Sequence, residues 1–350
     1  MYSREFTNPP ETIIRNGKAN FGTYNGVCKK FSITGMKAPY AGIPLPTFLS
    51  RLRIKSRLNY IFSLDKIFGR VDFFDFKVFG LAEVILWEKE TSKKYVYHTF
   101  MLSRKRFVPQ NTIQASCTSH RKARFIKISW QNNHKDISLK FKLKGDDVRP
   151  SVSGLIHGIS DSPSKADLMF VNPSPVSSRC SATWINTMNV RGKVLLNLSE
   201  ADNSTGLAAF VLNRTYFKLR SYTKMLYSLG KVKGKDVFFT MQYSNLDAAN
   251  ADLYNNNVLI VDGKPTALPS VIMTHPFGID KNWIIQDTES MVDLTFVPSS
   301  VTKRTLNIIA MRTSYSTIYG TFEGTLLTSE GEKITLRSLP GILYTAQLRI

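Results

Sequence analysis

Runs of apolar residues that alternate with polar ones recur along most of this chain, and they restrict the folds open to it more than any other feature. In the clearest run, Ile137, Leu139, Phe141 and Leu143 alternate with serine and lysine. Because successive side chains of a β-strand point to opposite faces of the sheet, a period of two predicts a strand with one buried and one solvated face. Helical periodicity is scarce, so we expect an all-β fold.

Turn residues divide these runs into separate strands. We expect strands over residues 78–87, 95–102, 125–130, 137–143, 193–198, 236–243, 257–261, 283–286, 292–296, 306–312, 319–327, 332–336 and 343–350. Asp262 and Gly263 give the strongest hairpin signal, since glycine tolerates the positive φ of a tight primed turn. The segment 46–62 allows either a short helix or a strand.

The chain has 350 residues, more than a single core usually organises, so we expect two domains. Glycines and prolines interrupt every long element between Lys144 and Pro175, and we place the domain junction there. Two groups of short strands around such a junction favour two antiparallel barrels or strongly curved sheets with few short helices. We predict one domain over residues 1–170, including a leading segment, and a second over residues 171–350.

Positive charge is concentrated in the first part of the chain. The formal net charge is +21, and residues 1–150 carry 28 Lys and Arg against 11 Asp and Glu. The predicted basic patch consists of Arg51, Arg53, Lys55, Arg57, Arg104, Lys105 and Arg106. Such residues either bind an anionic partner, such as a membrane surface, or form a solvated face. No nucleic-acid-binding motif is present, so we do not expect a nucleic-acid partner.

The chain shows no signal for export or membrane insertion. No apolar segment follows the first basic residue, and no apolar run approaches the length of about 18 residues that a spanning helix needs. Three scattered cysteines predict reduced thiols rather than a disulfide framework. The five histidines are isolated and no glycine-rich phosphate loop occurs, so we expect a cytoplasmic protein without metal, cofactor or transmembrane segment.

The residues identify no reaction. Paired carboxylates such as Asp72 and Asp75 can act as acid and base only if burial separates their pKa values. Trp283 and Asp293 lie in neighbouring predicted strands, where the indole would either stack on a ligand or fill the core. A barrel of this kind encloses one small apolar ligand or is filled by its own side chains, and the sequence leaves both open.

Short motifs follow one another along the chain in a definite order. They are residues 16–23 (NGKANFGT), Asn186 with Met188 and Gly192, residues 256–264 (NNVLIVDGK), Trp283, residues 292–298 (VDLTFVP) and residues 319–324 (YGTFEG). Together they resemble the family called domain of unknown function 2804. The resemblance implies two lipocalin-like (calycin) barrels, distantly related to carotenoid hydratases and tocopherol cyclases. On this basis we predict ligand-binding residues at Asn186, Arg214, Asn257, Trp283 and Asp293.

The chain departs from the family pattern at several polar positions. An acidic residue ahead of Arg214 is replaced by Val211, a glycine after it by Thr215, and a closing glutamate by Tyr344. Where the family often has Lys-Glu-Trp, this chain has Lys-Ser-Arg, ending at Arg57. If the polar residues of the family line a catalytic cavity, this chain has lost several of them.

Three functions follow as hypotheses. We favour binding of an apolar or amphipathic small molecule, such as a lipid or isoprenoid, without turnover. A hydratase or isomerase acting on such molecules is the alternative, and it requires a buried carboxyl of raised pKa at Asp293 or Asp72. The third is a scaffolding module that uses the basic patch against an anionic membrane or nucleic acid.

Overall fold

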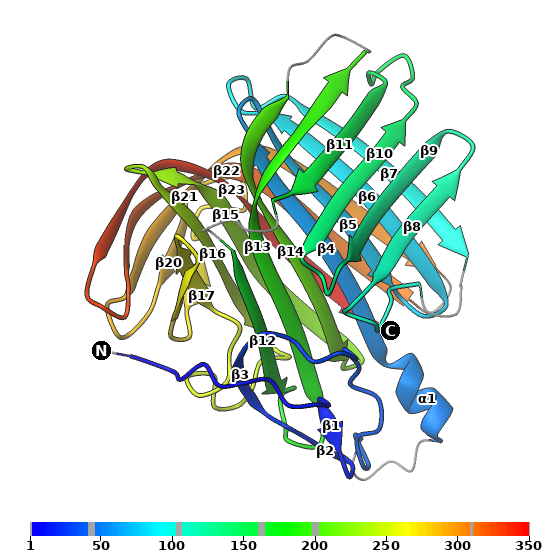
Figure 1. The fold of residues 1–350 in the computed structure, drawn as a ribbon, viewed down its shortest axis with the longest axis vertical. Coiled ribbons are helices and arrows are strands. Elements are labelled where there is room, and N and C mark those ends of the chain that lie inside the picture. The colour runs from blue at the N-terminus through cyan, green and yellow to red at the C-terminus, as the bar shows by residue number, and fades with distance from the viewer. Residues whose placement is uncertain are drawn as a thin grey trace.

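The fold consists of two large antiparallel sheets that face each other, as the computed structural model in Figure 1 shows. Residues 2–40, 46–102, 107–159, 165–197, 203–308 and 311–349 are described. One short helix, α1 (Thr47–Leu52), is present in these ranges. The all-β class and the two curved sheets are confirmed. Within the same ranges, no helix has both the length and the apolar character needed to cross a membrane.

The first sheet has twelve strands and curls into a nearly closed barrel. Its strands, with the small hairpin β1 and β2, are β1 (Ile14–Arg15), β2 (Lys18–Ala19), β3 (Gly22–Asn25), β4 (Ile54–Leu64), β5 (Ile67–Asp75), β6 (Phe79–Glu88), β7 (Lys94–Leu102), β8 (Ala115–Arg121), β9 (Arg124–Gln131), β10 (Asp136–Leu143), β11 (Val152–Gly158), β12 (Ala166–Pro173), β13 (Cys180–Leu196) and β14 (Ser204–Tyr216). The main path runs β7-β6-β5-β4-β14-β13-β11-β10-β9-β8, and β12 and β3 extend it from β13.

The second sheet has nine strands and forms a half-barrel. Its strands are β15 (Arg220–Val232), β16 (Lys235–Ser244), β17 (Val258–Val261), β18 (Lys264–Ala267), β19 (Ile272–Thr274), β20 (Trp283–Gln286), β21 (Val292–Ile308), β22 (Met311–Leu327) and β23 (Lys333–Arg349). They are ordered β18-β17-β16-β15-β23-β22-β21-β20-β19. The predicted Asp262–Gly263 hairpin joins β17 and β18, and both residues have positive φ, 48° and 79°.

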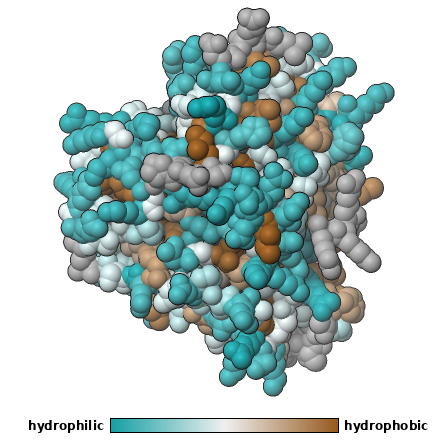
Figure 2. Space-filling model, viewed as in Figure 1, coloured by the Kyte–Doolittle hydropathy of each residue, from teal (hydrophilic) through white to brown (hydrophobic). Residues whose placement is uncertain are grey.

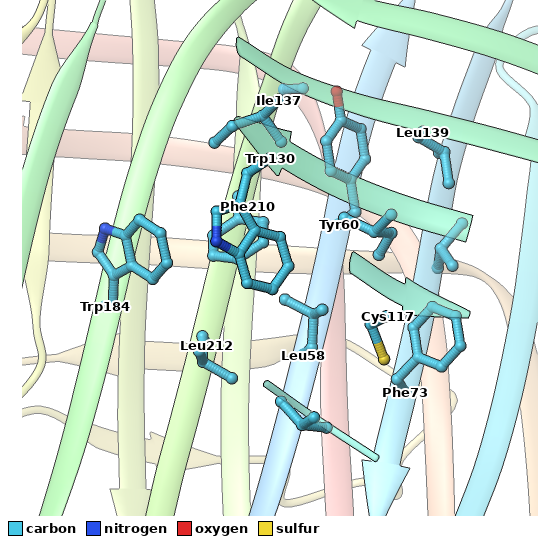
Figure 3. Close-up of a cluster of buried hydrophobic side chains, with 14 of the residues drawn as sticks. Leu58, Tyr60, Phe73, Cys117, Trp130, Ile137, Leu139, Trp184, Phe210 and Leu212 are labelled. Atoms are coloured by element: carbon cyan, nitrogen blue, oxygen red, sulfur yellow. The ribbon is translucent and has the colours of Figure 1, made fainter. Parts of the chain in front are cut away.

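Three apolar cores stabilise this arrangement, one inside each curved sheet and one between the sheets. In the first barrel the rings of Trp130, Trp184 and Phe210 lie 4.7 to 6.2 Å apart between centroids (Figure 3). This part of the barrel is therefore filled by its own side chains. On the outer surface, the face in Figure 2 is mostly hydrophilic, with hydrophobic side chains in small groups.

The strand β4 explains why the sheets face each other. Tyr60 and Phe62 belong to the core of the first barrel, whereas Ile61, which points the opposite way, belongs to the core between the sheets. Both faces of β4 are covered, so its burial is almost continuous. The segment 46–62, for which the sequence allowed either a short helix or a strand, contains both, because α1 ends just before β4 begins.

Several strand predictions differ from the structure. The strands predicted over 332–336 and 343–350 are one strand, β23, and the long strands β14 and β15 were not predicted. The segment 144–175, where glycines and prolines were expected to interrupt every long element, contains the short strands β11 and β12 of the first sheet. The expected strand over 306–312 instead includes the end of β21 and the start of β22, which pair with each other. The chain passes from one sheet to the other between Tyr216 and Arg220. The division at residue 170 stays a prediction, because sheet membership does not test which segments fold independently.

Candidate functional site

The interface between the two sheets is the candidate site. The strands β4 and β14 of the first sheet and β15 and β23 of the second contribute residues to openings at both of its ends. Between the openings lies the third apolar core, which includes Ile61, Val211, Tyr227 and Ile342. The interface therefore has an opening at each end, and the two openings differ in size and in lining residues.

At one end of the interface is a cleft of about 930 Å³. This volume is within the range of roughly 300 to 1,000 Å³ that is usual for small-molecule sites. Leu64, Val190, Leu207 and Leu339 supply apolar lining from four different strands. The cleft can therefore accept an apolar body as large as a typical ligand.

Charged residues around this cleft are mainly basic. Lys89, Lys231, Lys233 and Arg337 line it, together with the acidic Asp65 and Asp236. Lys231 Nζ lies 2.6 Å from Asp236 Oδ1, so part of this charge is already paired. Lys89 is half-buried, and this burial lowers the pKa of its ammonium. The remaining positive charge favours a ligand that carries an anionic group.

A buried ion cluster lies further along the interface, on the outward face of β4 and β5. Asp72 accepts hydrogen bonds from Arg57 Nε (2.9 Å) and Nη2 (2.7 Å) and from Arg70 Nη2 (2.9 Å). The Arg57 guanidinium lies 3.9 Å from the centroid of the Tyr344 ring on β23. Burial alone would raise the pKa of Asp72, but the charges of Arg57 and Arg70 outweigh it and lower that pKa. Asp72 is therefore an ionised partner in a salt bridge, not a proton donor.

Glu83 is a neighbouring buried carboxyl with the opposite shift, because burial raises its pKa. It accepts a hydrogen bond from the Tyr315 hydroxyl (3.1 Å), and Arg304 Nε lies 3.6 Å away. Arg304 also donates to Nδ1 of His98 (2.8 Å). Burial and the Arg304 charge lower the pKa of His98 to about 4, so this imidazole is neutral near pH 7.

The second opening of the interface is a cavity of about 70 Å³. Lys55, Arg57, Thr215 and Tyr344 are among its lining residues. It is far smaller than the sites that hold ligands of ordinary size. Lys55 Nζ donates to the carbonyl of Phe76 (2.7 Å), and burial lowers the pKa of Lys55 to about 8.

Two of the predicted ligand-binding residues lie in the first sheet, in separate places. Asn186 is buried, and its Nδ2 donates to Asp167 Oδ1 (3.2 Å). Arg214 is also buried, and its Nη1 donates to Ser56 Oγ (2.7 Å). Burial lowers the pKa of Arg214 to about 10. Neither residue lines the large cleft.

The other three lie in the second sheet or its loops. Asn257 Nδ2 donates to the carbonyl of Pro269 (2.7 Å), which anchors a loop. Trp283 is buried in the second core, with Nε1 donating to the carbonyl of Ile279 (3.1 Å). Asp293 is exposed on β21. The five residues are not brought together, and a ligand-binding role for them stays a prediction.

The predicted basic patch does not share one exposed face. Arg51 is exposed and Arg53 half-buried, whereas Lys55 is buried and the Arg57 side chain is only 13% exposed. The other three residues, Arg104, Lys105 and Arg106, lie outside the described residues. In the described part of the chain, no group of three or more His, Cys, Asp or Glu could hold a metal ion.

Sequence reasoning missed the lining of the large cleft. Its basic residues come from three different strands and belong to no motif: Lys89 follows β6, Lys231 lies on β15 and Arg337 lies on β23. For the small cavity the sequence did carry a signal, namely departures from the family pattern. Three of its lining residues are such departures: Arg57, Thr215 and Tyr344. These three departures are scattered in sequence but meet at one place in the structure, whereas Val211 lies in the core between the sheets.

Comparisons with known proteins give a family but no activity. A family model described as "Domain of unknown function (DUF2804)" matches residues 3–349. No curated protein matches the chain significantly. Among solved structures it is similar to CghA, with 11% identity, a TM-score of 0.46, and coverage of 85% of this chain and 88% of that one. It is also similar to kievitone hydratase from Nectria haematococca, with 7% identity, a TM-score of 0.42, and coverage of 84% and 88%. Neither similarity is close enough to bear on activity.

Proposed function

The chain belongs to the DUF2804 family, and we propose that it binds an amphipathic small molecule, with an apolar body and an anionic group, in the large cleft between the sheets. The observation that carries this proposal is the cleft itself, with its volume of about 930 Å³ and its apolar lining beneath a basic rim. Burial of apolar surface would supply most of the binding free energy, and the rim would orient the anionic end.

The buried and exposed carboxyl groups of this chain favour a protein that binds its ligand without catalysis. The enzymatic alternative needed a buried carboxyl of raised pKa at Asp293 or Asp72, but Asp293 is exposed and the pKa of Asp72 is lowered. Glu83 does have a raised pKa, yet it is not among the residues that line the large cleft. Tyr344 also stands where the family resemblance places a carboxylate. We therefore propose a binding protein and keep a hydratase acting through Glu83 as the second candidate.

Native mass spectrometry of the purified protein, followed by solvent extraction, tests the proposal. We expect a co-purifying molecule, and we expect a fluorescent long-chain carboxylate to bind and be displaced by it. Thr335→Trp, which fills the cleft, should weaken binding of the probe at least tenfold. Arg337→Gln should weaken it about fivefold if the lost charge contributes about 1 kcal/mol at the rim. Lys140→Gln, at an exposed position on β10, is the matched control and should leave binding unchanged.

The outcomes separate the two candidates. Equal binding by the wild type and Thr335→Trp would rule out the cleft as the site. An extracted molecule that gains or loses one water during incubation with the protein, but not with Glu83→Gln, would favour the hydratase.

A further inference from the structure

One end of the molecule gathers chain segments that are far apart in sequence. Lys55 Nζ donates to the carbonyls of Leu52 in α1 (3.0 Å) and Phe76 in the turn between β5 and β6 (2.7 Å). Arg53 Nη2 donates to the carbonyl of Phe217, just after β14 (3.0 Å). Figure 1 shows α1 at this end, near the mark for the C-terminus. We call it the α1 end, and it lies opposite the large cleft along the interface.

Large apolar side chains project from the α1 end into solvent. Their exposed fractions are 64% for Phe48, 40% for Leu52, 68% for Val78, 75% for Leu102 and 65% for Leu219. The ring of Phe79, next to Val78, is stacked on that of Phe100 at 5.0 Å, and Phe79 packs with Phe76 and Leu348 in a small buried cluster. Single exposed apolar residues are ordinary, but several at one end of a protein indicate an interaction surface.

A row of three arginines lies at the same end, on the second sheet. Arg349 on β23 is the direct cross-strand partner of Arg220 on β15 and of Arg312 on β22. All three are exposed, and they line a cleft of about 570 Å³. Like charges directly opposite each other on adjacent strands destabilise a sheet. Among the described residues no Asp or Glu forms a salt bridge with any of the three, so an external anion would relieve their repulsion.

The surroundings of the row are also basic. Arg51, Lys77 and Lys218 lie in segments of the α1 end, and the stretches 47–55, 76–79, 217–222 and 345–349 contain no Asp or Glu. Asp75, close by, is buried and paired with Lys77 (2.9 Å). The α1 end therefore combines the positive charge of the arginine row with exposed apolar groups.

We propose that the α1 end docks on an anionic lipid bilayer, with the arginine row binding lipid phosphates and the apolar side chains entering the headgroup region. Arginine suits this role because its planar guanidinium forms paired hydrogen bonds with phosphate oxygens. The apolar groups project from a helix, a turn and strand ends and not from one flat face, which suits a fluid layer better than a rigid protein partner. Basic and apolar groups in combination are what peripheral membrane contacts use.

Co-sedimentation of the full chain with vesicles tests this proposal. We expect binding to vesicles of equal parts phosphatidylcholine and phosphatidylserine, little binding to phosphatidylcholine alone, and a loss of binding as salt rises to physiological strength. Since each basic residue near the surface contributes roughly a fivefold factor, Arg220→Gln/Arg312→Gln/Arg349→Gln should weaken binding by about 100-fold. Phe48→Ser/Val78→Ser/Leu102→Ser should weaken it at least tenfold without changing its salt dependence.

The matched control removes the same charge elsewhere. Lys127→Gln/Lys140→Gln/Lys142→Gln alters a row of lysines on β9 and β10, where Lys127 and Lys140 are cross-strand partners. Equal losses in the control and the arginine variant would overturn the proposal, since only net charge would then matter. Binding of inorganic phosphate to the arginine row, without any binding to vesicles, would also overturn the proposal, because it would indicate a site for a soluble anion. Unchanged binding by both test variants would overturn it as well.

Discussion

Arg57 shows how a single side chain links the two sheets. Its guanidinium pairs with Asp72 on the neighbouring strand and stacks on Tyr344, which belongs to the opposite sheet. The pair is largely removed from water, so each partner depends on the other to compensate the cost of burying its charge. Removing one charge leaves a buried ion without its counter-ion, which costs far more than breaking an exposed pair.

We predict that Asp72→Asn lowers the free energy of unfolding by about 3 to 5 kcal/mol, because Arg57 and Arg70 both lose their counter-ion. Urea unfolding measures this change. The folded-state pKa of Asp72 is lowered, so its contribution is present at neutral pH and is lost as pH falls below the ordinary value for aspartate, about 3.9. The difference between wild type and variant should therefore shrink in acid.

Asp146→Asn is the control for this prediction. Asp146 also forms a salt bridge with an arginine, Arg149, but its side chain is 44% exposed. Solvent screening should make the effect of this substitution much smaller than that of Asp72→Asn. Similar losses in both variants would mean that Asp72 is not a buried counter-ion.

The sequence could not predict this role for Arg57. Its alternation with Leu58 and with apolar residues further along β4 has the pattern of a strand with a solvated basic face. Nothing in one strand shows that Tyr344, 287 residues later in the chain, covers that face. Local patterns predict which residues share a face but not what lies against it.

At the scale of elements, glycines allow the strands of the first barrel to curve around large rings. Gly69 on β5 is the cross-strand partner of Phe62 on β4, and a Cβ at Gly69 would lie only 2.1 Å from the Phe62 ring. The same arrangement recurs where Gly154 on β11 pairs with Phe141 on β10, at 2.2 Å. In both places the ring occupies the space that a side chain would need.

We predict that Gly69→Ala lowers the free energy of unfolding by about 1 to 3 kcal/mol, as overpacking of a dense core does. In a Phe62→Leu background the same substitution should cost less, because the smaller side chain leaves room for the new methyl group. A double-mutant cycle measured by chemical denaturation gives the coupling between the two positions. Additive effects would show that the ring does not set the requirement for glycine.

These pairs also explain which elements could be predicted. Strands with clear alternation, such as β10, agree with the sequence prediction to within a residue. Gly154 was instead grouped with loop-forming residues, because a glycine within a strand looks like a strand breaker unless its aromatic partner is known. The arginine row was missed for the same reason, since Arg220, Arg312 and Arg349 become neighbours only through pairing of strands distant in sequence.

At the scale of the whole molecule, the core between the sheets makes them depend on each other. Trp87 of the first sheet is stacked on Tyr319 of the second, with ring centroids 5.2 Å apart and an interplanar angle of 15°. Phe68, also in the first sheet, lies 5.5 Å from the same tyrosine ring. Separating the sheets would expose these rings to water, so unfolding of one sheet removes much of the apolar surface that stabilises the other.

We therefore predict that the two sheets unfold in a single cooperative transition. Trp130 and Trp184 report on the first barrel and Trp283 on the second core. Two variants each keep only one of these sets, with Trp87 replaced by Phe in both. In each variant the fluorescence transition in urea should coincide with the circular dichroism transition of the same variant, which reports on both sheets.

Tyr319→Ala should then destabilise both sheets equally, although Tyr319 belongs to the second alone. The loss of a large buried ring costs about 3 to 5 kcal/mol, and in one cooperative unit both tryptophan reporters must show the full shift. Two separate transitions, with only the Trp283 signal displaced, would instead mean that the sheets fold independently. That result would make the interface between them a contact of two stable domains, and the large cleft could then open and close by movement of one sheet against the other.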